Sequence, residues 1–140
     1  MSGEKDTKQV LVIRKDLRMR RGKEISQGSH GSGAFVFRQL QEQVLANRKA
    51  GIKTKVFAVT LSEAEQDWIA ESYAKITCQA NSEEQLLALE AKAQESGVVV
   101  HRIVDSGRTE FGGVSTNTCI AIGPDYVDVI EPVTGTLALY

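Results

Sequence analysis

The sequence lacks any apolar run that could cross a membrane, since a spanning helix needs about 20 consecutive apolar residues. No charged-then-apolar leader precedes Val10 either, so the chain is expected to be cytoplasmic and to have no membrane partner. Internal repeats and low-complexity tracts are absent from its 140 residues. A chain of this length predicts one domain that buries its core without disulfides or metal.

Cysteine and histidine are scarce, with two of each in the chain. Their spacing matches no metal-binding pattern, and His101 lies inside an apolar run, as a packed histidine would. Cys78 and Cys119 are far apart, each in an apolar run typical of a strand, which indicates buried and reduced thiols. We therefore expect neither a metal nor a cofactor.

Several enzyme signatures are also missing. Gly28, Gly31 and Gly33 give the order G-x-x-G-x-G, which differs from the dinucleotide-binding G-x-G-x-x-G, and no G-K-[ST] follows them. No G-x-S-x-G elbow of a serine hydrolase is present, although sequence alone leaves a Ser–His–acid arrangement open. Cys119 with His30 is a weaker nucleophile pair.

Charge is nearly balanced overall, with a formal net charge of −1, but it is concentrated locally. Residues 14–23 contain six Lys or Arg and one acid, directly after an apolar run of strand type. Most charge runs are solvated turns. Here the charges lead from a strand into a helix start, where phosphates bind well, so Arg18, Arg20 and Arg21 are candidate contacts with a nucleic-acid backbone.

The spacing of apolar residues predicts the secondary structure. Strands are expected at residues 10–13, 74–80, 98–104 and 117–122, and helices at 22–50, 62–71, 82–97 and 125–130. Ser62 with Glu65 and Ser82 with Gln85 have the spacing of capping boxes. Residues 53–60 fit either a strand or an extended linker, residues 137–139 a terminal strand or tail, and residues 1–9 a disordered segment.

This alternation of strands and helices predicts an α/β fold in residues 10–140. We expect a single three-layer domain with a small, mostly parallel (mixed) central sheet flanked by helices on both faces.

A polar stripe follows the first strand. If a helix begins near Gly22, then Lys23, Gln27 and His30 share one face, because their spacings are four and three residues. Open α/β folds place their sites just past their strands. Each residue also has a plain structural interpretation, as a surface lysine, a hydrogen-bonded amide and a core histidine. The nearby glycines would each cost about 1 kcal/mol relative to alanine, and a later helix start would scatter the stripe.

Asp105 is the best-placed carboxylate of the chain, since it follows VVVHRIV, a mostly apolar and β-branched run. It would emerge at the carboxyl end of that strand, where such folds build sites. The alternative is a strand-terminating Asp that starts a turn with Ser106 and Gly107. Thr116 and Thr118 would face one side of a strand, but β-branched residues are common in strands for their propensity alone.

Three segments carry a resemblance to a known family. The first is VLVIRKDLRMRRGKEISQGSH at Val10–His30, a strand followed by R-K-D-L, a basic turn, G-K and Q-x-x-H. The second is DSGRTEF from Asp105 to Phe111, and the third is STNTCIAIGPDYVDVIEPVTGTLALY from Ser115 to Tyr140. Together they span nearly the whole chain and resemble the type 2 peptidyl-tRNA hydrolases of archaea and eukaryotes.

The resemblance implies an esterase that cleaves the bond between a peptide, or an N-blocked amino acid, and the 3′ ribose of tRNA, which recycles the tRNA. Asp105 would orient or deprotonate a water, and Lys23 would keep Asp105 ionised and supply charge to the developing oxyanion. His30 is a second candidate base, and no covalent intermediate is expected. The residues expected to orient these groups by hydrogen bonds are Gln27, Thr109 and Thr116.

The same resemblance implies peptidyl-tRNA as the partner and allows a homodimer. RNA contacts are expected from the basic turn and the loop after Asp105, at Arg14, Lys15, Arg18, Arg20, Arg21 and Arg108. The chain departs from the family in its glycines beside Gln27 and His30, and in Ser115, where many relatives have Gly. A non-catalytic tRNA- or ribosome-binding domain of the same fold is therefore the alternative function. A small nucleotide- or phosphate-binding domain is a weaker third.

Overall fold

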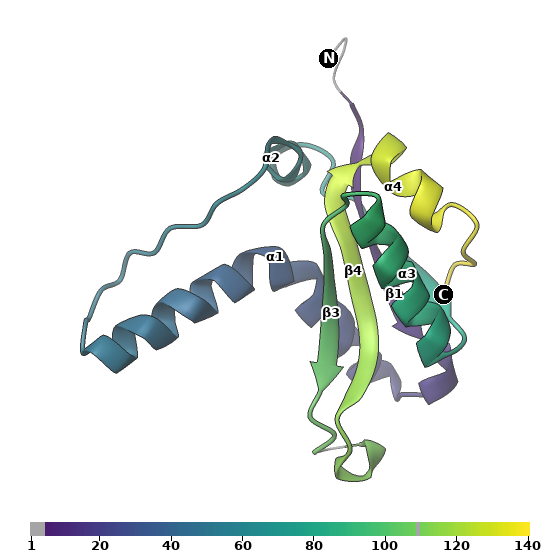
Figure 1. The fold of residues 1–140 in the computed structure, drawn as a ribbon, viewed down its shortest axis with the longest axis horizontal. Helices are drawn as coiled ribbons and strands as arrows, with labels where there is room; N and C mark the ends of the chain where they lie inside the picture. The colour runs from purple at the N-terminus through teal and green to yellow at the C-terminus, as the bar shows by residue number, and fades with distance from the viewer. Residues whose placement is uncertain (1–4, 109) are drawn as a thin grey trace.

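The computed structural model describes residues 5–108 and 110–140. Along the chain it forms β1 (Thr7–Arg14), α1 (Arg21–Ala50), α2 (Glu63–Ala70), β2 (Lys75–Ala80), α3 (Glu83–Glu95), β3 (Val100–Asp105), β4 (Thr116–Tyr126) and α4 (Val127–Thr134) (Figure 1). Two 3-10 helices, η1 (Lys15–Leu17) and η2 (Phe111–Gly113), follow β1 and precede β4. None of the helices in this part of the chain is long and apolar enough to span a membrane.

The four strands form one mixed sheet in the order β2-β1-β4-β3. β1 is parallel to β2, whereas β4 is antiparallel to both β1 and β3. α1 packs on one face and α3 and α4 pack on the other, so the predicted α/β class with a mixed sheet between helical layers is confirmed (Figure 1). Parallel pairing has a smaller share than predicted, because the connection from β3 to β4 is too short for a parallel crossover.

β1 is a central strand that is buried on both faces, which explains its continuous apolar sequence. Val12 packs with Leu86 of α3 and Ile130 of α4. Ile13, the next residue, points to the other face and packs with Ala34 of α1. The sheet therefore has a hydrophobic core on each face. α1, which carries the polar stripe, packs on the face of Ile13.

β1 begins at Thr7, before the predicted start, so residues 7–9 belong to the strand and not to a disordered segment. All three are polar but buried. Gln9 is accommodated because its side-chain amide donates to the Ser32 carbonyl at 3.0 Å and accepts from the Ser32 hydroxyl at 2.6 Å. Residues 1–4 of the segment predicted to be disordered lie outside the described residues.

Two helix starts carry serine caps. At α2, the Ser62 hydroxyl accepts from the Glu65 N–H at 3.0 Å, and the Glu65 carboxylate accepts from the Ser62 N–H at 2.8 Å, which completes the predicted capping box. At α3, Ser82 accepts from the Gln85 N–H, but the Gln85 side chain accepts from the Asn81 N–H instead. Only half of the second predicted box therefore forms.

The ends of the chain's later elements differ slightly from the prediction. β4 continues to Tyr126, so α4 starts two residues after the predicted Asp125 and runs to Thr134. Leu139 forms a single bridge with Cys78 of β2, which makes residues 137–139 a tail more than a strand. Residues 53–60 are extended and pair with no described strand, so the linker alternative is confirmed for them.

α1 is one continuous helix from Arg21 to Ala50, so its glycines do not delay its start. Gly31 lies directly against the sheet: a methyl group there would sit 3.5 Å from both Ala121 Cβ and Cys119 Sγ. Close packing of the first half of α1 on β4 therefore offsets part of the free-energy cost of glycine in a helix.

Replacing Gly28 by alanine should raise the free energy of unfolding by about 0.5–1 kcal/mol, because alanine favours the helix and restricts the unfolded chain. The new methyl group has room, since its nearest neighbour would be Leu11 Cδ1 at 3.8 Å. Urea denaturation followed by circular dichroism measures the change. In the matched control Gly51→Ala, the φ of +71° opposes a side chain, so the same substitution should destabilise. A destabilised Gly28→Ala variant would show that α1 packs more tightly on β1 than described.

Candidate active site

The carboxylate of Asp105, the last residue of β3, accepts hydrogen bonds from three described residues. Oδ1 accepts from Lys23 Nζ at 2.8 Å and from Gln27 Nε2 at 3.4 Å, and Oδ2 accepts from the Gly107 N–H at 2.8 Å. The side chains of Lys23 and Asp105 are 15% and 12% exposed. The ion pair is thus largely enclosed but remains open to solvent.

Segments far apart in the chain build this cluster. Lys23 lies in the first turn of α1 and Gln27 one turn later, so both side chains project toward the same point. That point is the carboxyl end of β3, because α1 packs across the sheet with its start beside Asp105. The structure therefore brings together three of the predicted site residues: Lys23, Gln27 and Asp105.

The hydrogen bond from Lys23 is the largest influence on Asp105, and it lowers the pKa of this carboxyl below its ordinary value. Partial burial acts in the opposite direction, and the Gly107 N–H and Gln27 lower the pKa further. Asp105 is therefore a carboxylate at neutral pH. A carboxylate with a low pKa is a good acceptor for orienting a water and a weaker base.

Thr118 fixes the orientation of Gln27. The Thr118 hydroxyl donates to Gln27 Oε1 at 2.6 Å, and both side chains are buried. Because Oε1 is taken, the amide nitrogen of Gln27 is the atom that faces Asp105. Thr118 is thus a positioning residue that the sequence did not single out; its only signal was the two-residue spacing from Thr116, which puts both on one side of β4.

Gly107 provides its N–H to Asp105 from a position that only glycine can occupy. Its φ is +80°, and a Cβ atom would lie 2.3 Å from the carbonyl oxygen of Val114. The loop after β3 therefore closes tightly on the segment before β4. The turn alternative for Asp105 is confirmed, since the residue ends its strand and starts this turn. It also accepts a hydrogen bond from Lys23, and its role in a site stays a prediction.

His30 stands apart from the cluster. It is exposed, and it lines a separate hollow of about 750 Å³ together with Ile103 and Val104 of β3. Seven residues of helix separate it from Lys23, about 10 Å along the axis, and the hollow that it lines does not include Asp105. It forms no hydrogen bond or ion pair with the described residues.

Of the two predicted threonines, Thr116 forms no hydrogen bond with the carboxylate in the part of the chain that the structure describes. Thr116 lies opposite Asp105 in the pairing of β3 with β4. Its hydroxyl donates to the Val114 carbonyl at 2.8 Å, so it shapes the loop that carries Gly107. Thr109 lies outside the described residues.

The predicted RNA contacts differ in their surroundings. Arg14 is enclosed by its bonds to the Asp16 carboxylate and the Asn117 carbonyl, and the bond to Asp16 raises the pKa of the guanidinium. Arg20 is exposed but donates to Glu110 at 2.9 Å. The remaining predicted contacts are exposed and form no ion pair with a described residue: Lys15, Arg18, Arg21 and Arg108.

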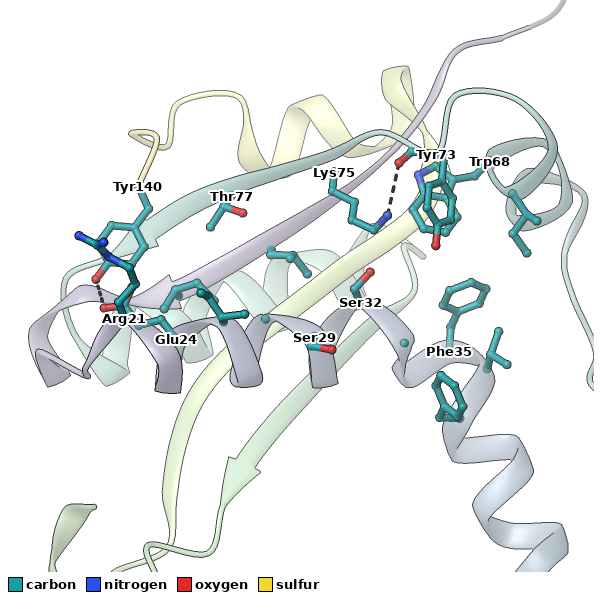
Figure 2. Close-up of a pocket in the computed structure, with 18 residues that line it drawn as sticks. Arg21, Glu24, Ser29, Ser32, Phe35, Trp68, Tyr73, Lys75, Thr77 and Tyr140 are labelled. Carbon is teal, nitrogen blue, oxygen red and sulfur yellow. Dashed lines mark hydrogen bonds between the residues drawn. The ribbon is translucent and has the colours of Figure 1, made fainter. Parts of the chain in front are cut away.

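A groove of about 1030 Å³ runs along the β2 side of α1 (Figure 2). At one end, the Tyr140 hydroxyl donates to Glu24 at 2.7 Å, and this bond raises the pKa of Tyr140 to about 12. Toward the other end, the Lys75 ammonium lies 3.4 Å from the ring centre of Tyr73. Asp105 does not line this groove, because β3 is at the opposite edge of the sheet.

The fold and the cluster define an α/β domain whose polar site lies at the end of β3 against the first turns of α1. No group of three or more His, Cys, Asp or Glu suited to a metal ion occurs within residues 5–108 and 110–140. The family model for "Peptidyl-tRNA hydrolase PTH2" matches residues 7–140. The chain therefore belongs to the PTH2 family of peptidyl-tRNA hydrolases, which confirms the predicted resemblance.

Individual relatives agree with this assignment. The chain is 38% identical to "Probable peptidyl-tRNA hydrolase 2" of Dictyostelium discoideum over 96% of its own length and 55% of that protein. It is 31% identical to "Peptidyl-tRNA hydrolase" of Thermococcus sibiricus, over 94% of its length and 96% of the relative. It is 34% identical to "Peptidyl-tRNA hydrolase 2, mitochondrial" of Homo sapiens, over 95% and 64%. The chain thus spans nearly all of the archaeal relative and about half to two thirds of the eukaryotic ones.

Proposed function

We propose that this protein is a peptidyl-tRNA hydrolase, which cleaves the ester between a peptide, or an N-blocked amino acid, and the 3′ ribose of tRNA. The observation that carries the proposal is the ion pair of Lys23 and Asp105 at the end of β3, in a chain that belongs to the PTH2 family. Relatives over nearly the whole chain bear the name peptidyl-tRNA hydrolase, which supports the same substrate.

In the proposed reaction, Asp105 orients the attacking water and accepts its proton as the water adds to the ester carbonyl. The tetrahedral intermediate then collapses, the bond from the carbonyl carbon to the ribose oxygen breaks, and Asp105 returns the proton to that leaving oxygen. Lys23 stabilises the negative charge that develops on the carbonyl oxygen. Gln27 and Gly107 hold the carboxylate in one orientation through their hydrogen bonds, and Thr118 holds Gln27. The rate gain comes from positioning and from fixed charge, since the groups are set before substrate binds.

A covalent cysteine intermediate has no support from the site. Burial raises the pKa of the Cys119 thiol to about 12, so the thiolate is scarce at neutral pH. The Cys119 thiol also donates to the backbone carbonyl of Gln27 at 3.4 Å. The weaker pairing of Cys119 with His30 as nucleophile and base is therefore set aside, and His30 has no part in the proposed step.

The binding-only alternative depended on the glycines near Gln27 and His30. These glycines lie within a continuous α1, and the cluster at Asp105 is assembled. No observation now favours loss of turnover. A homodimer and a cytoplasmic location stay predictions; the molecular mass in solution tests the first, and the location of a tagged chain in its own cells tests the second.

Arg18→Ala and Arg21→Ala should each weaken tRNA binding and reduce the slope of log K against log salt by about one unit for each lost phosphate contact. Both residues are exposed and pair with no described acid, so the fold should be unaffected. Fluorescence anisotropy of labelled tRNA over a salt series measures the slope. Lys92→Ala removes an exposed cation of α3, on the other face of the sheet, and should change nothing. Wild-type slopes in both arginine variants would move the RNA surface elsewhere.

A further inference from the structure

The chain has an arm, defined as residues 36–62, that projects from the domain beyond the edge of β3 (Figure 1). It consists of the second half of α1 and the extended segment that returns to α2. α1 changes direction beside Phe35, just after a run of two glycines and a serine, and such residues are frequent sites of helix bending (Figure 2). The buried residues of α1 all precede the arm: Gln27, Gly31, Ala34 and Phe35.

Two glutamines fasten the returning segment to the helix. The Gln39 side chain donates to the Thr60 carbonyl at 3.0 Å and accepts from the Thr60 N–H at 2.8 Å. Gln43 forms the same pair of bonds with Ala58, at 2.6 and 3.3 Å. A helix rises about 6 Å in four residues and an extended chain about 6.6 Å in two, so the two sets of bonds stay in register. These hydrogen bonds therefore fix the returning segment of the arm against α1.

The outer part of the arm is strongly basic. Residues 43–62 contain four Lys or Arg and no Asp or Glu, in a chain whose net charge is −1. These cations, which we call the arm tip, are exposed and form no ion pair with any described residue: Arg48, Lys49, Lys53 and Lys55. Uncompensated like charges on a projecting element repel each other, and a polyanion relieves that repulsion.

We infer that the arm tip contacts the phosphate backbone of the double-stranded part of the tRNA whose 3′ end lies at Asp105. The inference rests on the proposed function and adds a second contact to it. Arg38, at the base of the arm, donates to the Arg102 carbonyl of β3, the strand that ends at Asp105. From Arg38 to Arg48 the helix adds about 15 Å. The arm tip therefore stands well away from the carboxylate, where the duplex beyond a single-stranded 3′ end would lie.

The arm also exposes apolar side chains, which a second copy of the chain would cover. Leu45 is 57% exposed and Val56 is 83% exposed. The cations favour RNA over a second copy, because a symmetric pairing of two arms would bring eight like charges into one region. The oligomeric state is nevertheless measured in the test, since it separates the two occupants.

The test compares the wild-type protein with a variant in which all four cations of the arm tip are replaced by glutamine. Two substrates carry the same N-acetyl-aminoacyl ester: intact tRNA, and a short single-stranded oligonucleotide with the sequence of the tRNA 3′ end. On intact tRNA we expect KM to rise about tenfold at unchanged kcat. On the oligonucleotide we expect no change. Binding of uncharged tRNA should weaken similarly, with a salt slope lower by about two to three units.

Each outcome decides the inference. Equal KM values for wild type and variant on intact tRNA would overturn it, and so would an equal rise in KM on the oligonucleotide. A wild-type dimer that becomes monomeric in the variant, by light scattering, would show that the arm acts in assembly and would overturn it too. If the fourfold variant folds poorly, Lys53→Gln/Lys55→Gln replaces it, because this double variant leaves α1 unchanged. It should raise the logarithm of KM on intact tRNA by about half as much.

One readout and one control variant keep this test separate from the proposed function. Binding of uncharged tRNA requires no turnover, so it reports on the arm even if the wild-type protein hydrolyses nothing. Lys92→Gln is the matched control for charge, because it removes an exposed cation far from the arm. It should leave both KM values and the salt slope unchanged.

Discussion

Asp105→Asn is expected to lower kcat for hydrolysis of N-acetyl-aminoacyl-tRNA by about 10²–10⁴-fold, with little change in KM. Asparagine matches aspartate in size and keeps an acceptor oxygen for Lys23, but it cannot take a proton from water. It also removes the negative charge that Lys23 contacts at 2.8 Å. Initial rates of tRNA release over a range of substrate concentrations separate kcat from KM.

The control for Asp105→Asn is Asp128→Asn. Asp128 is a carboxylate of α4, on the other face of the sheet, and its side chain is 66% exposed. Its loss should leave kcat and KM at their wild-type values. If Asp105→Asn kept the wild-type kcat, the end of β3 would not be the catalytic site.

Lys23→Gln is expected to lower kcat by about 10²–10³-fold, because it removes the charge proposed to face the oxyanion. It should also change the pH profile. The hydrogen bond from Lys23 is the largest cause of the low pKa of Asp105, so that pKa should rise when Lys23 is lost. As the pH is lowered, activity that needs the carboxylate should then be lost at a higher pH than in the wild type, because Asp105 is protonated earlier. Profiles of kcat/KM against pH measure the shift.

The same ion pair should make a pH-dependent contribution to stability. The folded pKa of Asp105 is lower than the unfolded one, which is about 3.9. The contribution is therefore fully present above that pH and is lost as pH falls through the folded pKa. Urea unfolding at several pH values should show a shallower acid decline in Lys23→Gln than in the wild type. Identical acid limbs of activity and stability in the two proteins would contradict the coupling of Lys23 to Asp105.

The fold class follows from patterns that local physics makes visible in the sequence. β1 and β4 are central strands, and burial on both faces requires the continuous apolar runs that mark them. Lys23 and Asp105 could be foreseen as neighbours because a helix start and a strand end meet at the same edge of an α/β sheet. The family resemblance then joined these two positions to one chemistry.

Other features depend on partners that are remote in sequence. Thr118 bonds a side chain 91 residues away, so its spacing from Thr116 is its only local signal. Residues 7–9 have the polar sequence of a tail, yet they are buried because each side chain finds a partner far along the chain. These partners are Ser72 for Thr7, Glu131 for Lys8 and Ser32 of α1 for Gln9. His30 satisfies the helical spacing of the stripe, but spacing describes a face and not the distance along the axis, and His30 lies too far along it.

In the returning segment of the arm, the sequence pattern predicted the extended backbone but not its hydrogen-bond partners. Residues 53–60 alternate as a strand would, and two of them do bond in the strand manner. Their partners are the side-chain amides of Gln39 and Gln43, which take the place of a neighbouring strand. Alternation therefore indicated an extended chain correctly, while the nature of its partner lay outside the pattern.

Turnover of an ester on tRNA by this chain is tested most directly by hydrolysis of an N-acetyl-aminoacyl-tRNA pool under multiple-turnover conditions. A free N-acetyl amino acid ester serves as the comparison substrate. We expect many cycles of tRNA release per protein molecule, loss of that activity in Asp105→Asn, and no comparable cleavage of the free ester. Binding of the charged tRNA without release of its amino acid would contradict the account, and equal cleavage of both substrates would indicate a general esterase.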